Sequence, residues 1–206
     1  MGLKSTPLQE TDISFHRTLK LPRVGQIGFV VHDVDRAMEY YRDTFGIRPW
    51  LVSIPERSTC VVRGREIRAR LKIALAYSGR IQLELIEVLE GETVHTEALR
   101  EHGEGLHHLG FIVNDFTERL RACQAAGIEV LQQGGIEEMG FRIDYAYLDT
   151  VATGGVIFEL IQNRVGNLNV GMSPLLLRLA LLLQKRGGQA LRANDSTARE
   201  VMPIHP

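Results

Sequence analysis

Few cysteines, no excess of charge and no long apolar run limit what this 206-residue chain can be. Cys60 and Cys123 belong to no Cys-x-x-Cys or zinc-binding pattern, which favours a reducing cytoplasm. The 24 Lys and Arg balance 25 Asp and Glu, so we expect neither a nucleic-acid nor a membrane partner. Residues 1–20 lack the apolar stretch of a signal peptide. The longest apolar run, 175–183, contains Arg178 and is too short to span a bilayer.

Residues 26–33 and 108–115 are two copies of one pattern. The first reads Gln-Ile-Gly-Phe-Val-Val-His-Asp and the second His-Leu-Gly-Phe-Ile-Val-Asn-Asp, and they align without a gap. The similarity continues through a helix-like stretch to a Gly-Ile pair in each copy, at residues 46–47 and 127–128. Because two copies are too few for a solenoid, the repeat predicts two halves of one domain.

Each half is predicted to run as a strand, a helix and three further strands. Alternation over residues 24–31 indicates the first strand, and Asp33 is a good N-cap for a helix over residues 35–45. Residues 52–88 then resemble a meander of three strands, one of them over 67–77. Two such β-α-β-β-β modules, joined edge to edge, would form one curved mixed sheet in an α+β fold.

Segments outside the repeat complete the predicted organisation. The chain is predicted to begin with an N-terminal arm over residues 1–21. A paired domain over residues 22–163 follows, with modules at about 22–90 and 105–163. Residues 164–206 form a C-terminal helical extension and tail. Ser173 and Pro174 are typical of a helix start. The leucine-rich run that follows is apolar on nearly every side, which predicts burial against the domain or a second subunit, and we expect a homodimer.

Four polar residues occupy equivalent positions of the two halves. Gln26 and His108 begin the repeated motif, while Glu84 and Glu159 each lie inside an apolar strand. Singly, a strand histidine is usually a hydrogen-bonded structural residue, and a strand glutamate usually faces solvent. A buried carboxylate, however, is costly unless it is paired or bound to metal. Together the four predict a site for one divalent ion, with one nitrogen and three oxygen donors that suit Zn, Mn, Co, Ni or Fe.

The remaining histidines have more ordinary explanations. His107 points to the opposite strand face from His108, which favours a core or supporting role over ligation. His32 follows the first strand and is expected in a turn. We expect His95 and His102 at the surface.

Arg68, Arg70 and Lys72 alternate on one face of a predicted strand. Such a basic run is usually a solvated edge. Its regular spacing also permits contact with an anionic substrate, such as a carboxylate or a CoA phosphate, so these three residues are candidates for substrate binding.

The repeated halves, with the segments QIGFVVHD, LELIE, GLHHLGF and FELIQ, resemble the vicinal oxygen chelate superfamily. This group includes glyoxalase I, methylmalonyl-CoA epimerase, extradiol dioxygenases and bleomycin-resistance proteins. The resemblance covers about residues 22–163, and GLHH with a late ELxQ is particularly similar to the epimerases. It implies that the metal ligands are Gln26, Glu84, His108 and Glu159. Epimerases usually have His at the first place and often Gln at the second, whereas some glyoxalase I enzymes have Gln, Glu, His and Glu in that order.

Other positions separate the chain from individual members of the group. Val30 and Val88 stand where glutathione-using glyoxalase I has an Arg and an Asn, which disfavours a glutathione thioester as substrate. Extradiol dioxygenases use two His and one Glu, a set that these four residues do not supply. Bleomycin-type binders generally lack the metal ligands.

By resemblance, the chain is a metal-dependent enzyme that acts next to a carbonyl. A divalent ion would polarise the carbonyl, and a carboxylate would take and return the neighbouring proton, with Glu159 as the preferred catalytic base and Glu84 as the second candidate. Epimerisation of an acyl thioester of the methylmalonyl-CoA type is the preferred reaction. A glyoxalase I-like lyase and a metal-free small-molecule binding or resistance protein are the alternatives.

Overall fold

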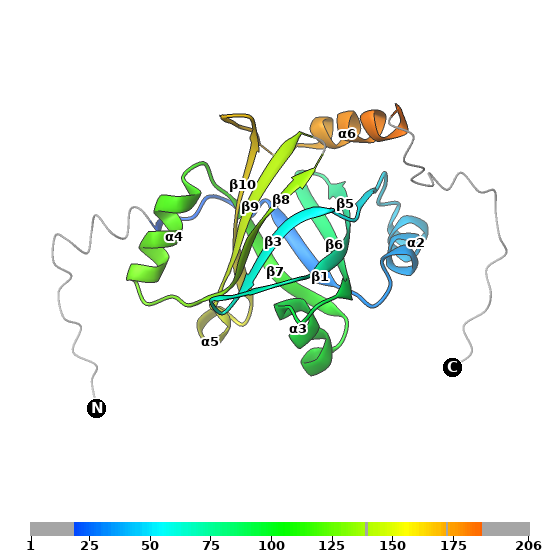
Figure 1. Ribbon diagram of the computed structural model, residues 1–206. Helices are drawn as coiled ribbons and strands as arrows, with labels where there is room; N and C mark the ends of the chain where they lie inside the picture. The colour runs from blue at the N-terminus through cyan, green and yellow to red at the C-terminus, as the bar shows by residue number, and fades with distance from the viewer. Residues whose placement is uncertain (1–18, 139, 172, 187–206) are drawn as a thin grey trace.

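The computed structural model describes residues 19–138, 140–171 and 173–186 (Figure 1). Most of the predicted N-terminal arm and the tail after residue 186 lie outside these ranges. Within them, helices cover a curled sheet, which confirms the predicted α+β class with a C-terminal helix. In this part of the chain no helix is long and apolar enough to cross a membrane.

The described strands form one mixed sheet in the order β2-β5-β6-β1-β7-β10-β9-β8-β3-β4, and β11 pairs with β10. The first half contributes β1, β2, β5 and β6, with bounds Gln26–Val30, Leu51–Ser53, Arg70–Ser78 and Ile81–Glu90. The second half contributes β7, β8, β9 and β10, with bounds Gly105–Ile112, Val130–Glu138, Phe141–Leu148 and Ile157–Val165, and then β11 (Leu168–Asn169). The two halves therefore join at their first strands.

The repeated strands β1 and β7 lie antiparallel at the centre of the sheet. On its other side each runs parallel to the last long strand of its own half, β6 beside β1 and β10 beside β7. This arrangement relates the halves by a pseudo-twofold axis between β1 and β7. It places Gln26 opposite Gly110, and Gly28 opposite His108.

A hairpin that the alternation did not predict extends the sheet. Residues 51–90 contain five strands rather than three, because β3 (Arg57–Val62) and β4 (Arg65–Ile67) lie between β2 and β5. Strand β3 leaves the first half and pairs antiparallel with β8, the edge strand of the second half. The sequence predicts a single strand over residues 67–77. In the structure, β4 ends at Ile67 and a separate strand, β5, starts at Arg70. Alternation gives the face of each residue but not the strand with which it pairs.

Helices α2 (Val34–Phe45) and α4 (Phe116–Ala125) cover the outer face of the two halves at equivalent places. Asp33 caps α2 by accepting a hydrogen bond from the Arg36 N–H, as predicted. Gly46 ends the helix in the left-handed conformation. Each helix buries an apolar cluster against its sheet, made of Val31, Val34, Ala74 and Leu85 in the first half and Val113, Cys123, Leu148 and Leu160 in the second. Both cysteines of the chain are buried and free.

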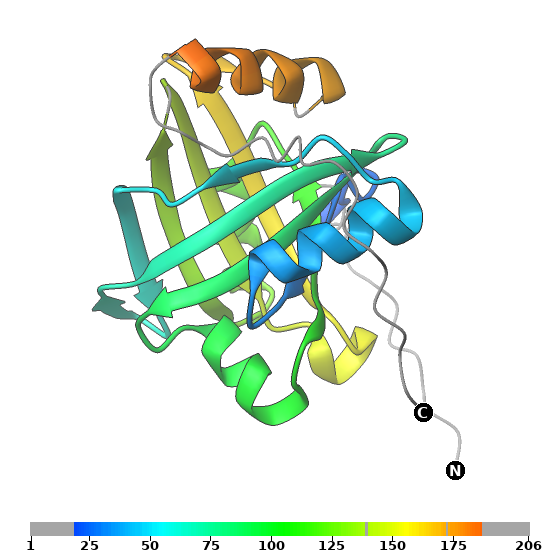
Figure 2. The same ribbon diagram turned by 90° about the vertical axis from the view of Figure 1, so that its right-hand side faces the viewer.

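The remaining helices lie at the ends of the curled sheet. Helix α3 (Val94–His102) connects the halves, and the short α5 (Val151–Gly154) precedes β10. Helix α6 (Pro174–Arg186) lies across the end of the sheet opposite α3, where it contacts β2 and β5 (Figures 1 and 2). Ser173 opens α6 by accepting a hydrogen bond from the Leu176 N–H, as its position predicts.

The predicted burial of α6 is correct for one face of the helix. Leu177 and Ala180 are buried toward the sheet, whereas Leu175, Leu179 and Leu182 are exposed. Pairing of this exposed face with a second copy of the chain stays a prediction.

Shortening one buried leucine tests how α6 is held. Leu177 is 7% exposed and Leu175 is 75% exposed, so the two make a matched pair on one helix. Leu177→Ala removes packing that fixes α6 and should cost about 2 kcal/mol locally. Amide hydrogen exchange over residues 174–182 should then accelerate roughly thirtyfold, measured by mass spectrometry. Leu175→Ala should leave exchange unchanged. Equal exchange in both variants and the parent would show that α6 is not held through Leu177.

Candidate metal centre

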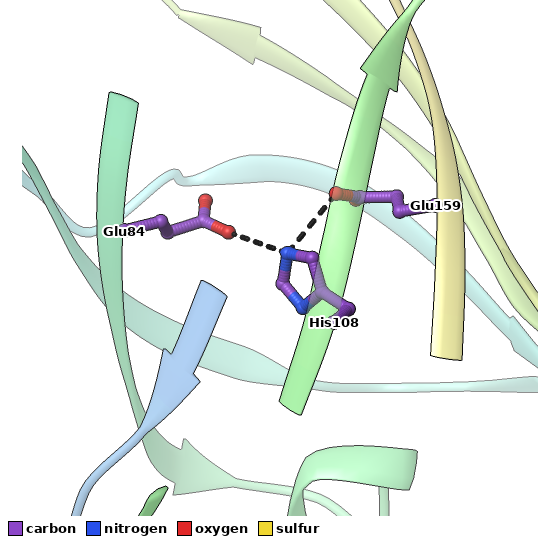
Figure 3. A group of neighbouring side chains, drawn as sticks. All are labelled: Glu84, His108 and Glu159. Atoms are coloured by element: carbon purple, nitrogen blue, oxygen red, sulfur yellow. Dashed lines mark ion pairs between the residues drawn. The ribbon is translucent and has the colours of Figure 1, made fainter. Parts of the chain in front are cut away.

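The centre of the sheet brings three predicted ligands together. Glu84 comes from β6, His108 from β7 and Glu159 from β10, and their side chains converge from three strands (Figure 3). The Nε2 atom of His108 lies 3.2 Å from a carboxylate oxygen of Glu84 and 3.1 Å from one of Glu159. Each residue offers a donor atom within 4.8 Å of the others, and the group could hold a metal ion. The His108 side chain is fully buried, so any charge here is shielded from water.

Two glycines of the repeated motif make room for this group. A Cβ atom on Gly28 would lie 1.9 Å from His108 Cε1, so the imidazole occupies the space directly over the Gly28 backbone. On the other side of the pseudo-twofold axis, a Cβ on Gly110 would lie 2.8 Å from the Gln26 side-chain oxygen. The glycine of each half therefore leaves space for the polar side chain of the other half. This explains why a polar residue and a glycine recur together in both copies of the motif.

Gln26, the fourth predicted ligand, lines the same cavity as Glu84 and Glu159. Its amide nitrogen donates a hydrogen bond of 2.8 Å to the Gln82 side-chain oxygen. That bond leaves Gln26 Oε1 as the free acceptor, and this atom is buried without a hydrogen-bond partner among the described residues. A buried unpaired amide oxygen is costly, and it is also a suitable ligand atom for a divalent ion.

The two carboxylates change the protonation of the histidine between them. Burial lowers the pKa of His108, but the negative charges of Glu159 and Glu84 outweigh this effect and raise it to about 9. Burial also raises the pKa of Glu159, and the charge of His108 opposes that rise. The group thus attracts a positive charge, supplied here by a proton on His108. Two carboxylates, one imidazole and one amide oxygen are an equally suitable environment for a divalent ion.

Buried aromatic residues support His108 from behind. His107 Nδ1 lies 2.9 Å from His108 Nδ1, and the Tyr147 ring packs against the His108 ring. Burial lowers the pKa of His107 to about 3, so its imidazole is neutral. This agrees with the supporting role predicted for His107. The neighbouring Tyr147 hydroxyl lies 3.2 Å from His95 Nε2, and the Tyr147 ring also packs against His108, which links a third histidine to the site.

The expectation that His95 lies at the surface is wrong. His95 is fully buried and lines the cavity, whereas His102 at the other end of α3 is exposed as expected. The signal was present in the sequence: Thr93 caps α3 with a reciprocal hydrogen bond to Thr96, which fixes the direction of the first turn. The polar composition of this linker concealed a first turn that faces inward. His32 lies exposed in the turn after β1, and its backbone N–H donates to Glu104.

The three basic candidates for substrate binding lie away from this cavity. Lys72 Nζ is 2.7 Å from Asp35 on α2, and Arg70 pairs with Glu90 at 3.4 Å. Arg68 is exposed between β4 and β5. The structure therefore places all three outside the cavity lining. The opposite face of β5 supplies the apolar residues that line it.

An apolar cavity of about 150 Å³ opens beside three of the candidate ligands, Gln26, Glu84 and Glu159. Its walls come from both halves and include Leu71 and Ile73 of β5 and Ile143 of β9, while Leu177 and Ala180 of α6 close the far side. A concave apolar space beside a few convergent polar groups is typical of a small-molecule site.

Comparison with known proteins agrees with this geometry. A model of the Glyoxalase/Bleomycin resistance protein/Dioxygenase superfamily matches residues 25–147, and the chain belongs to that superfamily. This confirms the resemblance inferred from the repeat. Among curated proteins, the Bacillus subtilis (strain 168) protein YqjC, described as uncharacterized, is 26% identical over 144 residues, which are 68% of this chain and 91% of YqjC.

Solved structures of similar fold include two methylmalonyl-CoA epimerases. The Mycobacterium tuberculosis enzyme is 22% identical with a TM-score of 0.51, over 68% of this chain and 87% of that one. A variant of the Streptomyces coelicolor enzyme in complex with 2-nitronate-propionyl-CoA is 26% identical with a TM-score of 0.51, over 69% and 97%. A mutant of 4-hydroxymandelate synthase from Streptomyces coelicolor shares the fold at 14% identity and a TM-score of 0.52, over 81% and 55%.

Metal analysis tests the four-residue site directly. Protein purified without chelator should carry about one divalent ion per chain, because one set of four ligands makes one site. His108→Ala and Glu159→Ala should each reduce the bound metal strongly, measured by inductively coupled plasma mass spectrometry. His102→Ala changes an exposed histidine and should retain full occupancy. Full occupancy in both site variants would remove these residues from consideration as ligands.

A methyl group at Gly28 provides a second test. Gly28→Ala places a Cβ where the His108 ring lies, so the ring must move or the strands must separate. We expect a loss of about 2 kcal/mol of stability together with weaker metal binding, measured by thermal unfolding and zinc titration. Gly154→Ala is the control, since an added Cβ there meets nothing within 4 Å. Normal zinc affinity in Gly28→Ala would show that the His108 position is not needed for binding.

Proposed function

We propose that this chain is a metal-dependent enzyme that removes and returns a proton on the carbon next to a carbonyl group. The observation that carries the proposal is the buried Glu84–His108–Glu159 group, which faces an apolar cavity beside the unpaired oxygen of Gln26. A divalent ion bound by these four residues would polarise a carbonyl oxygen and so make the adjacent C–H more acidic. Superfamily membership, and the epimerases among the structural neighbours, support this class of reaction.

Glu159 is the preferred base of the proposed reaction. It lines the cavity and is buried, and burial raises the pKa of its carboxyl group, so it accepts a proton more readily than an exposed glutamate. One oxygen of the Glu159 carboxylate lies 3.1 Å from His108 Nε2, and this contact holds the carboxylate beside the imidazole. Glu84, on the opposite side of His108, is the second candidate for this role.

An acyl thioester of the methylmalonyl-CoA type is the substrate class that the relatives support. This chain is 26% to 27% identical to the Streptomyces coelicolor epimerase in two of its solved structures, and the match covers 94% to 97% of that enzyme. Return of the proton to the opposite face of the same carbon would be epimerisation. Its return to the neighbouring carbon would be the isomerisation typical of glyoxalase I.

A metal-free binding protein is the second candidate, and one observation favours it. His108, with its raised pKa, can carry a proton that compensates Glu84 and Glu159 without any metal ion. The apolar cavity would then serve to sequester a small molecule. Measurements of metal content and of substrate proton exchange distinguish a metal-free binding protein from the proposed enzyme.

Exchange of a substrate hydrogen with solvent deuterium tests the proposed chemistry. The metal-supplemented protein should exchange the α-hydrogen of a 2-branched acyl thioester, followed by proton NMR. Glu159→Gln keeps an oxygen atom at the site but removes the basic carboxylate, so it should retain some metal and lose at least about a hundredfold in exchange rate. Glu118→Gln alters an exposed carboxylate on α4 and should exchange normally.

Two outcomes of this experiment would change the assignment. Turnover of the glutathione–methylglyoxal hemithioacetal, with no exchange in thioesters, would favour a glyoxalase I-like lyase despite Val30 and Val88. No exchange with any substrate from metal-loaded protein, together with tight binding of one of them, would favour the binding protein.

A further inference from the structure

The charges around the cavity are all of one sign. Glu84, Glu138 and Glu159 line it, and no lysine or arginine does so among the described residues. The Glu138 carboxyl group is partly buried and lines the cavity beside Ser53, so it belongs to the cavity wall rather than to the outer surface. The basic residues of the neighbouring strand β5 face outward, where Lys72 is held by Asp35.

A buried amide without partners lies farther along the same cavity. Glu159, Ile161 and Asn163 alternate on β10 and all three line the cavity, which places the Cα atoms of Glu159 and Asn163 roughly 13 Å apart. Asn163 is 3% exposed, and neither its amide nitrogen nor its amide oxygen has a hydrogen-bond partner within the described part of the chain. Because an unpaired buried amide is costly, this side chain points to a ligand with a polar group at that position.

Apolar side chains fill the space between these two polar ends. Ile161 lies between Glu159 and Asn163 on β10, and Leu71 and Ile73 line the cavity from β5. Leu176 and Leu177 of α6 add a wall that lies outside the residues matched by the superfamily model. The C-terminal extension of this chain therefore forms part of the cavity wall.

We propose that the part of the substrate that enters this cavity is an uncharged, largely apolar carbonyl compound, whose second polar group hydrogen-bonds Asn163. This inference rests on the proposed function for the part of the substrate that reacts, the carbonyl group at the candidate metal site. Glu84 and Glu159 already balance the charge of one divalent ion. An anionic group elsewhere on the substrate would face Glu138, and among the described residues no lysine or arginine lines the cavity to pair with it. Such like-charge contacts are strongly unfavourable. A neutral amide, ester or hydroxyl avoids this repulsion and satisfies the Asn163 amide. Within the proposed function, the substrates are then 2-branched acyl thioesters with an uncharged acyl group, and methylmalonyl-CoA itself, which carries a free carboxylate, is excluded.

Two compounds that differ by one charge test the inference. The first is methylmalonyl-pantetheine, which carries a free carboxylate, and the second is the same thioester with that carboxylate converted to a primary amide. Binding of both to the full chain is measured by calorimetry, with and without added zinc, and α-hydrogen exchange is followed on the same samples by NMR. The amide should bind about tenfold or more tightly than the carboxylate. Equal or tighter binding of the carboxylate, or binding of neither compound, would overturn the inference.

Three variants assign the preference to particular residues. Asn163→Leu removes the hydrogen-bonding amide at similar volume and should weaken binding of the neutral compound about tenfold, while zinc content stays unchanged. Glu138→Gln should reduce the discrimination between the two compounds. Glu137→Gln is the matched control, since Glu137 is the exposed neighbour of Glu138 and pairs with Arg142. Unaltered binding in Asn163→Leu, or unaltered discrimination in Glu138→Gln, would contradict the assignment.

The outcomes separate this inference from the proposed function. Loss of metal binding and of α-hydrogen exchange would refute the proposed function, because they report on the reacting end. The order of affinities for the charged and neutral compounds reports on the cavity alone. Exchange that proceeds only with the carboxylate would retain the proposed enzyme and reject the uncharged substrate.

Discussion

The antiparallel pairing of β1 with β7 is the contact on which the site depends. It places each half's polar residue over the other half's glycine, so that His108 lies over Gly28 and Gln26 lies against Gly110. Neither half could form the site alone. The parallel strands beside this pair then supply Glu84 and Glu159 from the two sides. The β1–β7 register sets the positions of Gln26 and His108, and the β1–β6 and β7–β10 registers place Glu84 and Glu159 beside them.

Burial of two carboxylates around one imidazole imposes a cost that the surrounding residues must compensate. His108 gains a proton that balances part of the charge, since its pKa rises to about 9. The Tyr147 ring packs against His108, and the Tyr147 hydroxyl lies 3.2 Å from His95 Nε2. The result is a rigid polar group at the end of an apolar cavity, with the basic residues of β5 held on the outside. These features are consistent with chemistry on a small carbonyl compound.

The sequence predicted the parts that the repeat determines. Two aligned copies predicted the paired modules, the first helix with its Asp33 cap, and a set of four residues of which three converge within ligand distance. The β3–β4 hairpin was missed because alternation does not identify a pairing partner, and β3 pairs across the sheet with β8. His95 was misplaced because a polar linker concealed a capped first turn. The half-buried state of α6 could not be deduced from leucines present on all its sides.

We propose that Gln26, Glu84, His108 and Glu159 together bind one metal ion. X-ray absorption spectroscopy of the zinc-loaded protein tests it most directly, because the spectrum distinguishes imidazole, oxygen and sulfur neighbours of the metal. We expect oxygen ligands with a single imidazole, whose contribution disappears in His108→Ala. Sulfur scattering, or an imidazole signal that persists in His108→Ala, would contradict it.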